Sequence, residues 1–172
     1  MGTEIERKFL VIGEGWRAGA KPIAIRQGYL CRGAGAVVRV RTMGESAFLT
    51  IKSDGTGISR LEFEYAVPPD DANVLLDTCC RRPLIEKTRY EADVNGLLWV
   101  IDVFAGENEG LVVAELELDS EDQAFDRPPW VGAEVSAQPR YFNAALSERP
   151  FSAWTAEERR AHDAGRDGPA PG

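Results

Sequence analysis

Histidine and cysteine are both scarce in this chain of 172 residues, which holds one histidine and three cysteines. The single histidine, His162, stands in a polar C-terminal stretch, and this argues against a histidine-based zinc site and against a Ser-His-Asp triad. Cys79 and Cys80 are adjacent and Cys31 is far from both in the sequence, so the three thiols do not resemble a disulfide framework. Reduced thiols in the cytoplasm are the simplest interpretation.

Long apolar runs and an excess of positive charge are also absent. No run is long enough to span a membrane, and the N-terminus is acidic and then apolar, which is not typical of a signal peptide. The formal net charge is −8, which argues against broad binding to nucleic acid or to acidic membranes but leaves room for a local basic pocket. We therefore expect a cytoplasmic protein of one domain with a short appendage and no membrane partner.

Alternating polar and apolar residues dominate the sequence from its N-terminus onward. With a strand period of two, Glu4, Glu6 and Lys8 share one face, and Arg7 and Phe9 lie on the other. The same alternation predicts strands over 4–12, 23–32, 36–42, 47–53, 59–67, 84–94, 97–105 and 111–118, with a hairpin turn at 95–96. Several strands joined by short turns predict an antiparallel barrel or a strongly curved sheet.

Helical segments are fewer than strands. We predict a helix over 72–80 with Asp70 or Asp71 as its N-cap, short helices over 120–125 and 140–148, and an exposed polar helix over 155–164. Residues 165–172 are rich in glycine and proline, a composition typical of disorder. The four tryptophans are expected to pack in the core and not to stack on nucleobases.

Charged residues stand in pairs at i and i+2 on the polar faces of the predicted strands. Like charges on one strand repel unless opposite charges lie across from them, and this favours faces that point inward. An inward set would hold a divalent metal against the acids and phosphates against the bases. On the pattern alone, a charged outer surface remains the alternative. The set comprises Glu4, Glu6, Lys8, Arg39, Arg41, Lys52, Glu62, Glu64, Lys87, Arg89, Asp102, Glu115 and Glu117.

The same residues carry a resemblance to a known family. The opening EIERK at 4–8 resembles the ExExK signature of the CYTH superfamily, also called triphosphate tunnel metalloenzymes. The similarity continues through QGYL at 27–30, VRVR at 38–41, LTIK at 49–52, EFE at 62–64, EKTRY at 86–90, IDVF at 101–104, VAELEL at 113–118 and RYFN at 140–143. It covers about residues 1–150, which we expect to form a CYTH triphosphate tunnel domain. Residues 151–172 would then be a polar C-terminal tail.

This resemblance implies an α+β fold, an eight-stranded antiparallel β-barrel, or tunnel, with a few peripheral helices. It also implies Mg²⁺ or Mn²⁺ as cofactor, a triphosphate-containing small molecule as substrate and, by family analogy, a homodimer. The implied metal ligands are Glu4, Glu6, Glu62, Glu64, Asp102, Glu115 and Glu117. The implied phosphate-binding residues are Lys8, Arg39, Arg41, Lys52, Lys87 and Arg89. Arg140 has a weaker claim, because the acid that relatives carry before the Arg-Tyr pair is missing here.

Among the family's activities, the short bacterial type with QGYL, LTIK and KTRY most resembles the inorganic triphosphatases, which cleave tripolyphosphate to pyrophosphate and phosphate. Tyr29 with Lys87 is the candidate catalytic pair, since a nearby ammonium lowers the pKa of a tyrosine. A water held by carboxylates is the competing base, and Tyr29 would then be a plain wall residue. The alternative functions are a class IV adenylate cyclase, a triphosphatase acting on thiamine triphosphate or nucleotides, and a polyphosphate- or nucleotide-binding module without turnover.

Overall fold

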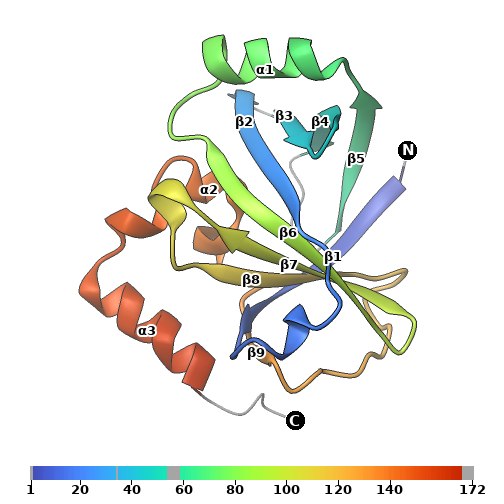
Figure 1. Cartoon of the computed structure of the whole chain (residues 1–172), viewed down its shortest axis with the longest axis vertical. Coiled ribbons are helices and arrows are strands. Elements are labelled where there is room, and N and C mark those ends of the chain that lie inside the picture. Colours follow the sequence, from blue (N-terminus) through green and yellow to red (C-terminus); the bar gives the residue numbers. More distant parts are fainter. Residues whose placement is uncertain (1, 34, 54–58, 168–172) are drawn as a thin grey trace.

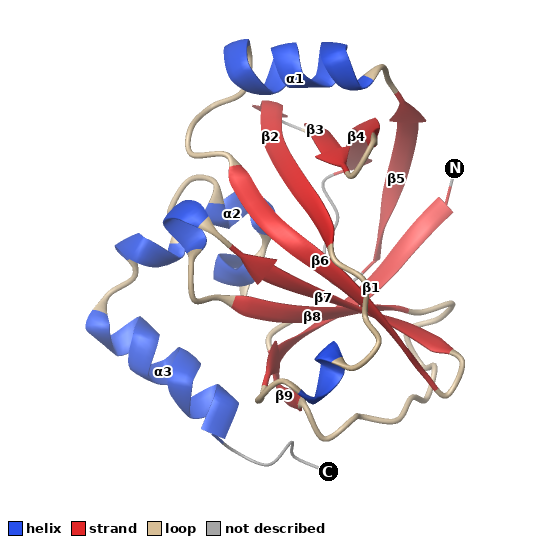
Figure 2. Cartoon of the chain, in the orientation of Figure 1, coloured by secondary structure: helices blue, strands red, loops and turns tan. Residues whose placement is uncertain are grey.

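Figure 1 shows a computed structural model of the chain, which describes residues 2–33, 35–53 and 59–167. Strands are the main regular elements of the described part, and helices lie around them (Figure 2). The strands are β1 Gly2–Val11, β2 Ile23–Gly33, β3 Ala36–Met43, β4 Ser46–Ser53, β5 Ser59–Ala66, β6 Ile85–Val94, β7 Leu97–Phe104, β8 Val112–Glu117 and β9 Val131–Glu134. The α-helices are α1 Pro69–Thr78, α2 Asn143–Leu146 and α3 Ala156–Asp167, and the 3-10 turns are η1 Gly15–Arg17, η2 Gly106–Asn108, η3 Pro139–Tyr141 and η4 Phe151–Ala153.

All strand pairings in the described part are antiparallel, in the order β5-β4-β3-β2-β6-β7-β8-β1-β9. The first part of β1 also pairs with β5, and its later part pairs with β8. This extra pairing links both ends of the eight-strand order, which confirms the predicted antiparallel barrel. The ninth strand, β9, was not predicted and lies against the end of β1. No helix in the described ranges is long and apolar enough to cross a membrane.

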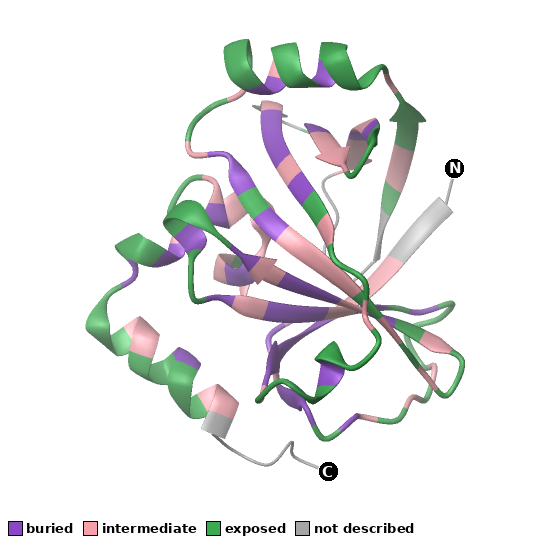
Figure 3. Ribbon diagram, viewed as in Figure 1, coloured by how far each residue is buried: buried purple, intermediate pink, exposed green. Residues whose placement is uncertain are grey.

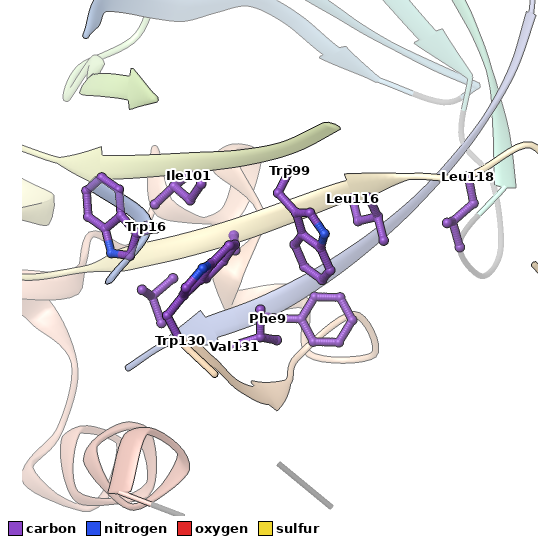
Figure 4. Close-up of a cluster of buried hydrophobic side chains, with 10 residues drawn as sticks. Phe9, Trp16, Trp99, Ile101, Leu116, Leu118, Trp130 and Val131 are labelled. Carbon is purple, nitrogen blue, oxygen red and sulfur yellow. The ribbon is translucent and has the colours of Figure 1, made fainter. Parts of the chain in front are cut away.

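The outer face of the barrel carries the larger hydrophobic cluster, which Figure 4 shows. Phe9, Trp99 and Leu116 project from β1, β7 and β8, and Trp16 and Trp130 cover them from the flanking loops. The ring centroids of Phe9 and Trp99 lie 5.4 Å apart, and those of Trp99 and Trp130 lie 5.5 Å apart in an edge-to-face arrangement. These aromatic pairs confirm that the tryptophans serve packing, and burying each such side chain stabilises the fold by about 2–3 kcal/mol.

A second outer cluster lies beneath α1, which crosses β2, β3 and β4. Val40 and Ala47 on the strands pack against Ala72 and Leu76 on the helix, and all four are buried. Figure 3, which colours the ribbon by burial, shows buried segments on the strands of the barrel and mostly exposed segments on α1. Because side chains alternate along a strand, Arg39 and Arg41, on either side of Val40, point to the inner face. The apolar outer face therefore fixes the direction of the charged inner face.

One end of the inner face is apolar, and the C-terminal segment packs against it. Leu10, Ile85, Phe104 and Val113 each stand two residues along a strand from a charged inner residue. They form one cluster with C-terminal side chains. The C-terminal members of this cluster are Tyr141, Leu146, Phe151 and Trp154. The barrel interior is thus divided into a charged part and an apolar end.

The last helix, α3, contacts β1 and β9 and is not simply exposed. His162 is only 1% exposed. Its ring lies among those of Tyr141, Phe151 and Trp154, at centroid distances of 5.9, 5.2 and 6.2 Å. The predicted polar helix over 155–164 is therefore present, but one of its faces is buried against the barrel. The disorder predicted over 165–172 is wrong for residues 165–167, which belong to α3, and residues 168–172 lie outside the described residues.

Three helix predictions require correction. Residues 120–125 form no helix: the Gln123 N–H donates to Ser120 O at 3.2 Å and the Asp119 N–H to Gln123 Oε1 at 2.7 Å. Phe125 packs against Phe9 and Trp99. The helix over 140–148 is broken at Phe142, whose backbone is extended at φ −78° and ψ 138°. Helix α1 begins at Pro69 with Pro68 as N-cap, because proline suits the first helical position. Asp70 and Asp71 lie in its first turn.

Gly28 provides a test of how closely α1 and its following loop approach the barrel. A Cβ at this position would lie 2.6 Å from Cys80 Cβ and 2.9 Å from Leu84 Cδ2. We expect Gly28→Ala to lower the free energy of unfolding by about 1–3 kcal/mol, measured by urea denaturation. Gly15→Ala is the matched control, because its Cβ would meet nothing closer than Trp130 Cδ1 at 3.6 Å. Equal stability of the two variants would contradict this packing.

His162 provides a pH test of the docking of α3. Burial, together with the positive charge of Arg166, lowers the pKa of His162 from 6.5 to about 4. The unfolded chain thus takes up a proton near pH 6.5 and the folded chain only near pH 4, so stability is lost as the pH falls through this window. We expect a loss of about 3 kcal/mol from this group. Urea denaturation at pH 7, 5.5 and 4.5 should show a shallower pH dependence for His162→Phe than for the wild type, and equal slopes would refute the assignment.

Candidate active site

Lys8 stands at the centre of one charged wall of the barrel interior. Its ammonium forms ion pairs with Glu6 on its own strand and with Glu115 on β8, and the residue is only 5% exposed. The β1–β8 register sets Lys8 opposite Glu115 and Glu6 opposite Glu117. Burial by itself lowers the pKa of Lys8, but the carboxylates of Glu115 and Glu6 outweigh it and raise the pKa above its usual range. Lys8 is therefore a permanent cation between two acids.

Asp102 joins two further bases on the same wall. Its carboxylate forms an ion pair with Lys87 and accepts two hydrogen bonds of 2.8 Å from the Nε and Nη2 of Arg89. Arg89 Nη2 also lies 3.3 Å from Glu115 Oε2, which connects this group to Lys8. The wall thus consists of Lys8, Lys87 and Arg89 against Glu6, Asp102 and Glu115.

Lys87 has an ammonium with a lowered pKa. Burial and the positive charge of Arg89 together lower this pKa to about 8, in spite of the attraction of Asp102. For Asp102, burial favours the neutral acid, but Lys87 and Arg89 outweigh it, so its pKa lies below the usual value. A lysine with a pKa of about 8 can hold or release a proton near neutral pH.

A second charged wall is formed by β3, β4 and β5. Arg41 Nη2 donates to both oxygens of Glu64, at 3.2 and 3.0 Å. Lys52 Nζ lies 2.9 Å from Glu62 Oε2. Arg39 Nη2 lies farther from the acids, at 3.6 Å from Glu64 and 3.9 Å from Glu62. Every predicted acid and base of these three strands therefore lies on the inner face, in pairs of opposite charge.

Tyr29 lies on β2, between the two walls. It is 8% exposed, stands opposite Arg39 in the register, and accepts a 3.3 Å hydrogen bond from the amide of Gln27. The β2–β6 register sets Lys87 opposite Ile25, four residues before Tyr29 on β2. The two members of the predicted catalytic pair thus lie on adjacent strands and are offset along them.

Arg140 contacts C-terminal aromatic side chains. It belongs to η3, donates to Gln138 Oε1 at 2.7 Å, and places its guanidinium 5.3 Å from the ring of Tyr141 and 5.2 Å from that of Trp154. The structure thus puts Arg140 with the C-terminal aromatic cluster. Its predicted contact with substrate stays a prediction.

The interior carboxylates are suitable ligands for a hard divalent cation, because Mg²⁺ and Mn²⁺ prefer carboxylate oxygens. The ammonium of Lys8, bridging Glu6 and Glu115, shows that a cation is favoured between these two side chains. Within the described residues, no three acidic, histidine or cysteine side chains form a complete ligand group. The side chain of Glu4, the first predicted ligand, lies outside the described residues. Its backbone belongs to β1.

Two buried polar residues of the interior were not singled out from the sequence. Thr50 is fully buried between Arg39 and Glu64, and Gln27 is 1% exposed beside Tyr29. Both follow the period-two alternation of charged or aromatic interior residues, so the alternation was the signal that could have found them. A search limited to ionisable groups passes over them.

Comparison with known proteins now defines the class. The family model for the CYTH domain matches residues 2–149, and this chain belongs to the CYTH family. It is 46% identical to an inorganic triphosphatase of Acetivibrio thermocellus over 151 residues, covering 88% of this chain and 97% of that protein. It is 41% identical to an inorganic triphosphatase of Nitrosomonas europaea, covering 84% of this chain and 97% of that protein.

Solved structures show the same architecture. A crystal structure of an inorganic triphosphatase matches with a TM-score of 0.62 and 38% identity, covering 86% of this chain and 95% of that one. A Pyrococcus horikoshii protein matches with a TM-score of 0.53 and 18% identity, covering 69% and 80% of the two chains. The more distant match shows the fold alone.

Asp102 provides a stability test of the first charged wall. Replacing it with asparagine leaves Lys87 and Arg89 buried without their shared carboxylate, and removing one partner of a buried ion pair costs about 3–5 kcal/mol. We expect Asp102→Asn to show this loss in urea denaturation carried out with a chelator. The control is Asp77→Asn, because Asp77 is 55% exposed in its pairs with Arg26 and Arg82, and such pairs contribute about 0–1 kcal/mol. A loss of less than 1 kcal/mol for Asp102→Asn would contradict the pairing described.

Proposed function

We propose that this chain is a metal-dependent inorganic triphosphatase, which hydrolyses tripolyphosphate to pyrophosphate and phosphate inside its charged barrel. The observation that carries the proposal is the interior itself, where bases and acids face one another in two walls, of which the first is buried. Such an interior suits a ligand made of a polyanion and a divalent cation, since each finds its opposite charge there. The two relatives named as inorganic triphosphatases, at 46% and 41% identity, support this substrate.

The bases would bind and orient the phosphates. Arginine offers forked donors to phosphate oxygens and lysine a compact charge, so substrate would exchange the carboxylate partners of these side chains for its own oxygens. Neutralising the phosphoryl oxygens also stabilises the transition state of phosphoryl transfer, because charge is spread over them. The proposed phosphate-binding residues are Lys8, Arg39, Arg41, Lys52 and Arg89.

The acids would hold the metal. Carboxylates released from their bases become free to bind a divalent cation, which supplies further charge neutralisation and orients the water when bound. We assign the main role to Glu4, Glu6 and Glu117, with Glu115, Glu62, Glu64 and Asp102 assisting directly or through water. Mg²⁺ and Mn²⁺ both suit such oxygen ligands, and we expect either to support activity.

Lys87 is our candidate for proton handling, together with Tyr29. Its pKa of about 8 allows a fraction of the side chain to be neutral near pH 7.5, and a carboxylate-held water is the competing route. In its ammonium form Lys87 would bind phosphate, and its action on Tyr29 stays a prediction, because the two residues are offset along adjacent strands. A cytoplasmic location and a homodimer remain predictions, with the three cysteines as free thiols in support of the first.

The test is phosphate release from tripolyphosphate, ATP and thiamine triphosphate, each with Mg²⁺, with Mn²⁺ and with chelator. We expect metal-dependent release that is fastest from tripolyphosphate. Glu6→Gln should lower kcat/KM by about 100-fold or more, since it removes a metal ligand. Glu86→Gln is the control, because Glu86 is on β6 but exposed on the opposite face to Lys87.

Other outcomes would identify the competing functions. Pyrophosphate released from ATP without free phosphate would indicate an adenylate cyclase. Tight binding of tripolyphosphate without turnover would indicate a binding module. Activity that is unchanged by chelator, or by Glu6→Gln, would contradict the proposal.

A further inference from the structure

Thr50 occupies the middle of the second charged wall. It lies on β4, directly opposite Arg39 on β3 and directly opposite Glu64 on β5. Its side chain is fully buried. A buried hydroxyl must find hydrogen-bond partners, because leaving it unpaired costs stability. One charged neighbour on each side, Arg39 and Glu64, supplies these partners.

The Thr50 hydroxyl uses both of its functions at once. It accepts a 3.0 Å hydrogen bond from Arg39 Nη2 and donates one of 2.9 Å to Glu64 Oε2. Arg39 Nη2 thereby lies 3.6 Å from Glu64 Oε2. Arg41 Nη2, by contrast, donates directly to the two oxygens of the same carboxylate, at 3.2 and 3.0 Å. The hydroxyl therefore stands between Arg39 and Glu64, whose ion pair at 3.6 Å is longer than the 3.0 Å pair of Arg41 with the same acid.

This arrangement leaves Arg39 with donor capacity. Arg39 is 9% exposed, and its Nε is buried without a hydrogen-bond partner in the described part of the chain. A guanidinium has five N–H donors, and carboxylates or phosphates normally take them in pairs. The guanidinium of Arg39 has an unused donor, and its hydrogen bond goes to a neutral hydroxyl. Such a guanidinium is better able to bind an incoming anion than a guanidinium that is hydrogen-bonded to a carboxylate.

We propose that Thr50 is a positioning residue for the substrate: its hydroxyl holds Arg39 away from Glu64, so that the guanidinium stays available to a phosphate of tripolyphosphate. The proposal rests on the proposed function only for the identity of the anion. Without the hydroxyl, Arg39 would move into a direct ion pair with Glu64, and substrate would have to compete with that carboxylate.

The experiment measures tripolyphosphate binding by calorimetry in the presence of chelator, so that metal binding and turnover do not contribute. Thr50→Val keeps the size of the side chain and removes the hydroxyl. We expect it to weaken binding about tenfold, the effect of one hydrogen bond to a charged group. Thr50→Ser, which restores the hydroxyl, should bind within about twofold of the wild type. Thr42→Val is the matched control, because Thr42 is next to Arg41 on β3 and so points to the opposite face of the barrel.

A double-mutant cycle separates this role from a merely structural one. If Glu64 captures Arg39 in the Thr50→Val protein, then the same change made on a Glu64→Gln background should cost less than about threefold. An equal cost on both backgrounds would overturn the proposal, as would unchanged binding by Thr50→Val. Absence of binding by the wild type under chelator would also overturn it, because Arg39 would then not be available to the anion.

Turnover provides the second readout. In the presence of metal, Thr50→Val should raise KM for tripolyphosphate more than it lowers kcat, since the arginine contacts substrate before the reaction. A wild-type protein that binds tripolyphosphate but does not hydrolyse it would contradict the proposed function and leave the binding test of Thr50 intact. The two claims therefore fail separately.

Discussion

The cost of removing charge from water governs the interior of this barrel. An isolated buried ion costs several kcal/mol even after relaxation, so each buried base needs an acid in contact with it. Lys8 between Glu6 and Glu115, and Asp102 between Lys87 and Arg89, meet this requirement on the first wall. The strand register that places Lys8 opposite Glu115 is thus as necessary to the fold as any apolar contact. A register slip of one residue would place these charges on the outside and bring Phe9 and Leu116 inside.

Under the proposed function, the same pairing would prepare the interior for its ligand. Bases that already face acids are oriented and partly desolvated, and a polyanion with a divalent cation would exchange one set of opposite charges for another. The apolar end of the barrel contributes by a different route. At this end, Leu10, Ile85 and Phe104 on the inner face pack against the C-terminal segment. This packing stabilises that end of the strands. His162, on α3, is buried beside this cluster, so the C-terminal helix belongs to the packed structure and is not only an appendage.

The period-two alternation predicted most of this architecture from the sequence. It identified eight strands, the hairpin at Asn95 and Gly96, whose positive φ angles of 55° and 82° suit that turn, and the face that carries the charges. It could not assign which acid pairs with which base, because the register depends on contacts between strands. Strand β9 was missed because four residues between a proline pair and a loop carry little periodic signal. The burial of His162 was missed because a polar helix does not reveal which of its sides will dock. Thr50 was missed because its importance depends on its two cross-strand neighbours.

The central claim is that the inner acids and bases form one site for a metal and a triphosphate together. The most direct test is anomalous diffraction from crystals of the wild-type protein grown with Mn²⁺ and a non-hydrolysable triphosphate analogue. We predict manganese within about 2.5 Å of carboxylate oxygens on β1 and β8, beside Glu6 and Glu117, with the phosphates against the bases of both walls. Manganese bound outside the barrel, or an analogue bound on the outer surface, would contradict this account.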